Sequence, residues 1–330
     1  MLTALAVDVL SDAGAYGNHS TGVMFHGCGE SVSLYRCANK RVDARAVYTN
    51  NLPSGAFRGY GLSQMIFAVE SALDELALRL GIDAFELRRR NVVVPGDSFV
   101  DAHVADDDLT FGSYGLDQCL DLVQAALRDF PDDVPHGWVV GDGMAAAMIA
   151  TIPPRGHLAE ASVTVSAGGD YVLSVGTAEF GNGTTTVLRQ IGATDLAADF
   201  DRIELWHADT DAVAHDTGAF ASAGITVAGK ALHAACLTLA RRMRERAAAL
   251  TGTDAASASL TSTGVETIAG LVGFAELCAD GELTADGSEL GEQRSLAFNV
   301  HAVRVAVDPT TGTVRILQSI QSADAGFVMN

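Results

Sequence analysis

Residues 48–97 hold the strongest local signals of the chain and read YTNNLPSGAFRGYGLSQMIFAVESALDELALRLGIDAFELRRRNVVVPGD. Apolar residues recur at three- and four-residue spacing between Ile66 and Leu80, which predicts an amphipathic helix. Ser63 is a suitable N-cap for this helix, and Gly81 is a suitable stop. The segment therefore predicts a Gly-rich loop, GAFRGYG, that runs directly into a helix.

Strand and helix patterns alternate on both sides of this segment. Residues 4–16 alternate apolar and polar positions and predict a strand. DFPDDVPH at 129–136 is the best linker candidate. Further elements are expected as helices at 84–90, 115–128, from about Thr185 and at about 227–250, and as strands within 160–179, at 202–207 and in a hairpin that turns at 308–312. The patterns predict a mixed α and β architecture in at least two segments.

Composition limits the possible partners. The chain has 21 Lys and Arg against 41 Asp and Glu, so its formal net charge is −20. Such a charge repels nucleic acid and anionic lipid, and no apolar run reaches the roughly 18–20 residues of a membrane span. The five cysteines form no CxxC pair, which argues against an iron–sulfur cluster or structural zinc in this chain. We expect a cytoplasmic protein that binds neither nucleic acid nor membranes.

Three Gly-rich loops each precede an expected helix: GAFRGYG at 55–61, GTAEFGNG at 176–183 and TGAFASAG at 217–224. Free main-chain N–H groups at a helix start bind anions, and small residues let a ligand approach closely. Three such loops suggest one extended anionic cofactor. Each loop taken singly can equally be a tight strand-to-helix turn, and none completes a GxGxxG fingerprint.

The segment at 48–97 resembles, nearly residue for residue, the stretch around the molybdenum in the xanthine dehydrogenase and aldehyde oxidase family, the molybdenum hydroxylases. GTAEFGNG, TGAFASAGITVAGKAL, VDPTTGTVRI and DAGFVMN follow that family in order and spacing. The resemblance implies an α+β fold of molybdopterin-binding domains. It implies the C-terminal part of a first domain at 1–130 and the N-terminal part of a second at 131–330, so we expect a chain that is truncated at both ends.

The resemblance also assigns residues to the molybdopterin cofactor. Arg58 and Ala221 correspond to residues beside the molybdenum, and Asn182 stands where the family usually has Gln. The positions expected to bind cofactor are Phe57, Arg58, Gly59, Gly181, Asn182, Gly183, Phe220, Ala221 and Ser222.

Two further positions correspond to substrate contacts. Tyr60 aligns with an aromatic that stacks on the substrate ring, and His26 falls where purine-oxidising members place an Arg. The alternatives are a half-buried aromatic under the loop and a structural histidine. Among the acidic residues, Glu70, Asp74 and Glu75 are expected to be solvated or capping charges, and Glu179 to contact main-chain N–H groups.

The function implied is hydroxylation of an N-heteroaromatic such as hypoxanthine or xanthine, with water as the oxygen source. Electrons would leave through iron–sulfur clusters to flavin (FAD) on other domains or subunits. The family's catalytic Glu is expected outside this chain, so no catalytic residue is assigned and the isolated chain should be inactive. The alternatives are an aldehyde-oxidising member and a catalytically inactive remnant or interaction scaffold. A carbon monoxide dehydrogenase type is less favoured by the sequence around Arg58.

Overall fold

The structure is a computed structural model that describes residues 1–99, 109–128, 134–153 and 156–327. The chain divides into unit 1, Met1–Ala150 with Ser295–Asn330, and unit 2, Thr151–Arg294. Strand β4 (Val139–Ala150) joins unit 1 because it pairs along its length with β12 (Arg294–Val307). The compact units therefore do not follow the expected division at residue 130. The assignment of residues 1–130 and 131–330 to two cofactor-binding domains stays a prediction.

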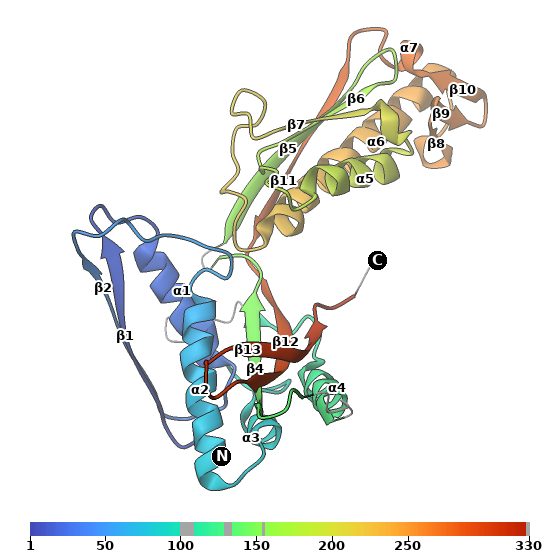
Figure 1. Cartoon of the computed structure of the whole chain (residues 1–330). Coiled ribbons are helices and arrows are strands. Elements are labelled where there is room, and N and C mark those ends of the chain that lie inside the picture. The colour runs from blue at the N-terminus through green and yellow to red at the C-terminus, as the bar shows by residue number, and fades with distance from the viewer. Residues whose placement is uncertain (100–108, 129–133, 154–155, 328–330) are drawn as a thin grey trace. The chain divides into compact units, whose positions relative to one another are not determined.

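Unit 1 begins with a strand–helix–strand crossover (Figure 1). The expected first strand is β1 (Leu5–Gly14), and it pairs in parallel with β2 (Lys40–Tyr48). Helix α1 (Ser20–Ser33) connects them, because parallel neighbours need a crossover. The sequence patterns did not predict α1, because its glycines and serines give only a weak apolar stripe.

Helix α2 (Leu62–Leu80) is the helix predicted after GAFRGYG. It ends as predicted at Gly81, whose φ of +63° is left-handed. The prediction of Ser63 as N-cap is wrong, because helical backbone begins at Leu62 and the N-cap is Gly61, with φ +90°. Left-handed backbone, which glycine adopts without a Cβ penalty, sets this helix start in place of a side-chain oxygen.

The other elements of unit 1 are α3 (Ala84–Asn91), β3 (Leu109–Thr110), α4 (Leu116–Arg128), β4, β12 and β13 (Val314–Asp324). Among them, α3 and β4 pack against α2, and α4 packs against β13 and α3. β12 lies between β13 and β3 and also pairs with β4. The predicted hairpin of β12 and β13 is confirmed, with the Gly312 N–H donating to the Asp308 carbonyl at 2.8 Å. Residues 129–133 of the predicted linker lie outside the described residues.

A buried carboxylate connects four segments of unit 1. Glu70 on α2 is 4% exposed and accepts hydrogen bonds from the Tyr35 hydroxyl, from the Arg88 guanidinium at 3.1 and 3.2 Å, and from the Ala146 N–H at 2.8 Å. Burial raises the pKa of Glu70, while the Arg88 charge and these hydrogen bonds oppose the rise. Loss of the Arg88 charge would leave the Glu70 carboxylate buried without its counter-charge, at a cost of about 3–5 kcal/mol.

These contacts correct the expectation for the acidic residues of α2. Glu70 is neither solvated nor a cap, and Asp74 pairs with the fully buried Arg88 at 2.6 Å. Only Glu75 fits the expectation, because its side chain is 70% exposed and pairs with Arg79 one turn later. The three residues differ because α2 turns one face toward α3 and β4 and the opposite face toward solvent.

Unit 2 is a four-stranded sheet with α5 (Thr184–Leu196) and α6 (Gly229–Thr251) on one face (Figure 1). Strict alternation of buried residues along β5 shows the apolar face on which the helices pack. Across the sheet the strands are β11 (Leu283–Gly291), β5 (His157–Val165), β6 (Tyr171–Val175) and β7 (Ile203–His207). The smaller elements are η1 (Phe200–Arg202), the π-helical turn η2 (Gly224–Ala228), η3 (Ala255–Ser257), β8 (Ser259–Thr261), β9 (Gly264–Thr267), β10 (Gly270–Gly273) and α7 (Phe274–Leu277).

The direction of the strands places two of the Gly-rich loops. β6 and β7 run parallel, whereas the other neighbouring pairs of this sheet are antiparallel. Loops 176–183 and 208–223 therefore leave the carboxyl ends of parallel strands at the same sheet edge, where open α/β sheets bind ligands. The predicted class, α+β with mixed sheets and packed helices, is confirmed.

Candidate functional site

In unit 1, the predicted loop is a turn of three left-handed residues. Gly59, Tyr60 and Gly61 have φ values of +97°, +46° and +90°. Glycine is required at position 61, because a Cβ there would lie 2.1 Å from the main-chain oxygen of Val23 on α1. This close approach of α1 sets the loop directly against the helix that carries His26.

Two histidines of unit 1 hold Tyr60. His26 Nδ1 lies 3.1 Å from the Tyr60 carbonyl oxygen, and the two rings meet edge to face at 5.5 Å. His26 Nε2 lies 3.4 Å from the carboxylate of the buried Glu30, one helical turn later. His19 Nδ1 lies 3.1 Å from the Tyr60 hydroxyl, and burial raises the pKa of that hydroxyl. The structure thus brings together the two residues expected to contact substrate and adds His19, which lacked a sequence signal.

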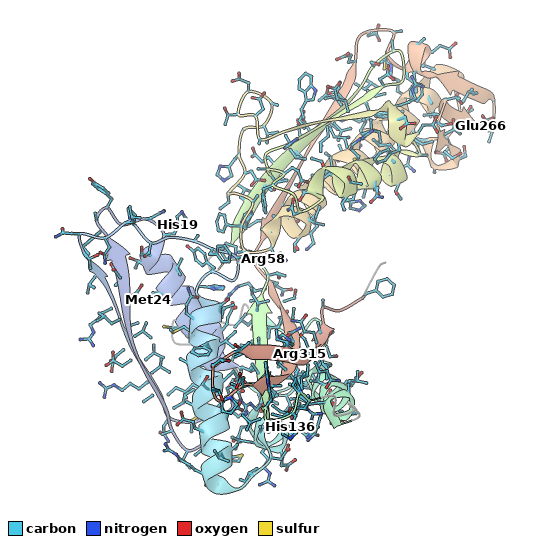
Figure 2. The ribbon with its side chains drawn as sticks, viewed as in Figure 1. His19, Met24, Arg58, His136, Glu266 and Arg315 are labelled. Carbon is cyan, nitrogen blue, oxygen red and sulfur yellow. The ribbon has the colours of Figure 1, made fainter. Side chains whose placement is uncertain are left out.

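Arg58 precedes this turn and is exposed (Figure 2). Within the described part of the chain, its guanidinium has neither an ion-pair nor a hydrogen-bond partner. The neighbouring Phe57 is also exposed, at 84%. A delocalised cation with its donors free is suited to a bidentate anionic group.

In unit 2, Glu179 uses the main-chain donors of the loop GTAEFGNG. Its carboxylate accepts the N–H groups of Thr185 at 3.0 Å, Gly181 at 2.6 Å and Gly183 at 3.2 Å. These bonds, led by that from Thr185, lower the pKa of Glu179 to about 2 against the opposing effect of desolvation. The expected contact of Glu179 with N–H groups is confirmed. The start of α5 therefore offers a ligand fewer free donors than the loop sequence suggested.

The third loop has two consecutive left-handed residues that are not glycine. Ala221 has φ +51° and Ser222 has φ +56°. The Ala221 carbonyl accepts the N–H of Ile152 at 2.6 Å, and Phe220 is 51% exposed. Among the described residues we find no acceptor for the N–H groups of Ala221 and Ser222. Successive free N–H groups of this kind form a concave anion site.

Beneath the third loop, three buried polar atoms have no hydrogen-bond partner among the described residues: His157 Nδ1, Asp216 Oδ2 and Thr177 Oγ1. The His157 and Phe220 rings pack edge to face, with their centroids 5.6 Å apart. Burial lowers the pKa of His157, and the Asp216 charge opposes this shift. Because buried polar atoms are normally paired, this sheet edge fits a polar ligand group or water. The third loop and Arg58 fit an anionic cofactor, whereas the loop at 181–183 fits less well.

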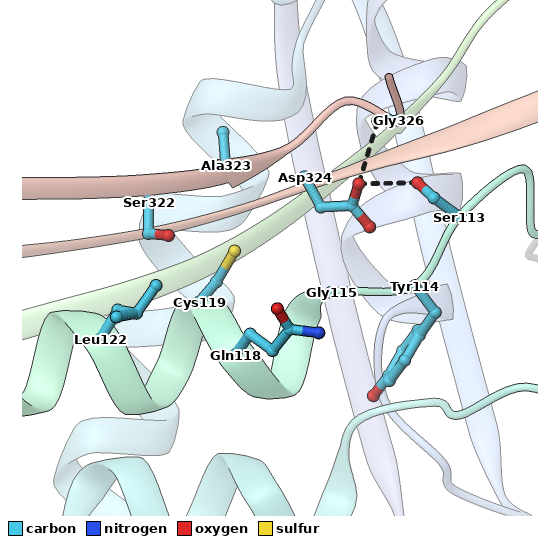
Figure 3. Close-up of a pocket in the computed structure, with 10 residues that line it drawn as sticks. All are labelled: Ser113, Tyr114, Gly115, Gln118, Cys119, Leu122, Ser322, Ala323, Asp324 and Gly326. Atoms are coloured by element: carbon cyan, nitrogen blue, oxygen red, sulfur yellow. Dashed lines mark hydrogen bonds between the residues drawn. The ribbon is translucent and has the colours of Figure 1, made fainter. Parts of the chain in front are cut away.

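A cavity in unit 1 is lined by residues that include Ser113, Tyr114 and Asp324, and no predicted site residue is among those that line it (Figure 3). Asp324 borders it and accepts hydrogen bonds from the Ser113 hydroxyl at 2.6 Å and the Gly326 N–H at 2.9 Å. Desolvation would raise the pKa of Asp324, but these hydrogen bonds lower it overall. The carboxylate thus joins the end of β13 to the loop before α4, which is a structural role.

The described ranges contain neither a metal-binding cluster of side chains nor a membrane-spanning helix. There, no group of three His, Cys, Asp or Glu side chains is placed to hold a metal ion, and Cys28, Cys37, Cys119, Cys236 and Cys278 are buried free thiols. No helix of these ranges is long and apolar enough to cross a membrane.

Comparison with known families shows the family to which the chain belongs. Two sequence families described as molybdopterin cofactor-binding domains match residues 1–92 and 119–330. The chain belongs to the molybdopterin cofactor-binding domain family. The predicted resemblance and the predicted cofactor, molybdopterin, are confirmed at this level, and the family is one of oxidoreductases of the xanthine and aldehyde type.

Relatives with curated names include the "Probable hypoxanthine oxidase XdhD" of Escherichia coli K12, 28% identical over 344 residues that cover 100% of this chain and 36% of that protein. The aldehyde oxidoreductase molybdenum-binding subunit PaoC of the same organism is 29% identical over 316 residues, covering 91% and 41%. The chain thus spans less than half of either relative. Quinoline 2-oxidoreductase from Pseudomonas putida 86 shares the fold, with a TM-score of 0.75 at 24% identity over 96% of this chain and 44% of that one.

The pKa of Glu179 generates a prediction for unit 2. The pKa of Glu179 is lowered from 4.5 to about 2 in the folded state, so the ionised carboxylate stabilises the fold at pH values above the unfolded-state pKa. This contribution is lost as the pH falls through the folded-state pKa. Glu179→Gln should therefore reduce the loss of stability between about pH 7 and about pH 3. Urea unfolding at both pH values measures this, with Glu266→Gln, an exposed glutamate on β9, as control. An unchanged pH dependence in Glu179→Gln would contradict the capping role.

Proposed function

We propose that this chain is the molybdopterin-binding part of a molybdenum hydroxylase. The proposed contacts are those of the resembling family: Phe57, Arg58 and Gly59 in unit 1, and Gly181, Asn182, Gly183, Phe220, Ala221 and Ser222 in unit 2. The observation that carries the proposal is Arg58, an exposed cation without a described partner on a turn fixed by left-handed backbone. Family membership names the anion that this cation would meet.

The residues of each unit would contribute differently to binding. Arg58 would neutralise anionic charge with a bidentate pair of donors, and the N–H groups of Ala221 and Ser222 would add main-chain donors. Asn182 is exposed and offers an amide, but the main chain around it is already held by Glu179. When bound, the cofactor supplies molybdenum for two-electron oxidation with water as oxygen source. Arg58 and Ala221 are the residues that we propose beside the metal.

We assign no general base within the described residues near these loops. A general base works best with a pKa near the working pH, and the Glu179 pKa of about 2 makes it a poor acceptor. Glu30 is buried and faces His26, so its carboxylate is directed at a side chain of its own helix. As the resemblance to the molybdenum hydroxylases implies, we propose that the base comes from a further segment and that this chain alone is inactive.

For the substrate we propose an N-heteroaromatic ring in preference to an aldehyde. Relatives named for hypoxanthine and for aldehyde oxidation have similar identity to this chain, so the preference rests on residues. Tyr60 carries a ring that His19 and His26 hold in place, and a flat substrate can stack on such a ring. Iron–sulfur and flavin subunits are the proposed electron acceptors, in keeping with a relative named as a molybdenum-binding subunit.

Arg58→Ala tests cofactor binding. Loss of a charged hydrogen-bonding group should weaken retention by about 10- to 100-fold. The measurement is molybdenum and pterin per chain in the full-length gene product, purified from a host that makes the cofactor. Arg79→Ala is the matched control, because Arg79 is an exposed arginine that pairs only with Glu75 among the described residues. Full occupancy in Arg58→Ala would contradict the proposed site, and a wild-type protein without molybdenum would favour the inactive remnant or scaffold.

Tyr60→Ala tests the substrate class in the active full-length protein. Stacking worth about 1 kcal/mol predicts that KM rises about fivefold for hypoxanthine and much less for acetaldehyde. Tyr60→Phe keeps the ring and should keep the KM for hypoxanthine near the wild-type value. If Tyr60→Ala raises both KM values equally, the proposed preference for a ring substrate is wrong.

A further inference from the structure

Ile152, at the start of unit 2, has an unusual backbone conformation. Its φ is +67°, in the left-handed region that β-branched residues rarely adopt. The next residue is Pro153, and a following proline further restricts the backbone of the residue before it. Such a conformation persists only where the surrounding structure over-determines it, and it is often found at functional sites.

Both main-chain groups of Ile152 are held. Its N–H donates to the Ala221 carbonyl at 2.6 Å, and its carbonyl accepts Nε of Arg294 at 3.0 Å. Ile152 and Arg294 are each 3% exposed, so the hydrogen bond between them is buried, whereas Ala221 is half-buried. Gly291 leaves room for the isoleucine side chain, because a Cβ on Gly291 would lie 3.0 Å from Ile152 Cδ1.

The hydrogen bonds that begin at Arg294 and pass through Ile152 end at the strained part of the third loop. Ala221 and Ser222 are themselves left-handed, and the hydrogen bond from Ile152 reaches the loop between them. At the opposite end of the loop, the Thr217 N–H donates to the Leu158 carbonyl at 2.9 Å and the Gly218 N–H donates to Asp216 Oδ1 at 2.8 Å. Ile152 is therefore the support nearest to the residues that we propose for cofactor binding.

We propose that Arg294 is a positioning residue that holds Ala221 and Ser222 in their binding conformation through Ile152. The importance of this conformation for cofactor binding rests on the proposed function. The hydrogen-bonded link from Arg294 through Ile152 to Ala221 does not. Arg294 lies 72 residues after Ser222 in the sequence and has no sequence signal of its own. Its guanidinium would act without touching the cofactor.

The test is hydrogen exchange on the full chain without cofactor, comparing wild type with Arg294→Met. Methionine fills similar space but cannot donate, so the amides of Ile152, Phe220 and Ala223 should exchange about tenfold faster. Ile152 is well suited to this measurement, because the following proline contributes no amide signal. Amides in the centres of β5 and β6 should keep wild-type rates. A second variant, Arg294→Lys, retains a charge but moves the donor away from the Ile152 carbonyl, and the same local pattern is expected.

Arg189→Met is the matched control. Arg189 Nε also donates to a main-chain carbonyl of unit 2, that of Ile203 at 2.9 Å, but at the beginning of β7. This variant should leave exchange in the third loop unchanged. Unchanged exchange at Ile152 and the loop in both Arg294 variants would overturn the proposal, as would an equal increase throughout unit 2. The molybdenum content of the full-length variants is measured separately. A protein that never binds cofactor would refute the proposed function, and the exchange result would still decide whether Arg294 positions the third loop.

Discussion

The buried Glu70 carboxylate is the interaction on which unit 1 depends. It is fully used by Tyr35, Arg88 and Ala146, which come from the end of α1, from α3 and from β4. Because Glu70 lies on α2, this network also fixes the helix whose first turn follows Gly61. The buried charge pair lies about two helical turns from the start of α2, so it fixes the helix onto which the turn with Arg58 and Tyr60 runs, and an apolar core alone would not impose that specificity.

In both units, candidate binding residues lie on or next to left-handed main chain that other groups hold. Histidines and a close approach of α1 hold the turn at Tyr60, while Ile152 holds the turn at Ala221. Strain of this kind costs about 1–3 kcal/mol for each residue, and it is retained where a fixed geometry is useful. At the start of α5 the protein satisfies the helix itself through Glu179, so the three Gly-rich loops are not equivalent.

Much of this could be predicted from the sequence, and the failures have physical reasons. Apolar periodicity located α2 and its stop at Gly81, and turn residues located the hairpin at 308–312. The N-cap at Gly61 was missed because the residue type alone does not determine the backbone φ. Glu70 was misassigned because a helix pattern does not show that Arg88 will lie opposite it, and Ile152, Arg294 and His19 were missed because their roles depend on contacts between distant segments.

The central claim is that the loops of both units contact one kind of anionic cofactor. Its most direct test is a comparison of hydrogen exchange in the full-length protein with and without molybdopterin. The account predicts slower exchange on cofactor binding in residues 57–61 and also in 219–224, with little change around Asp324. Protection confined to one of the two loops, or absent from both in a protein that holds stoichiometric molybdenum, would contradict it.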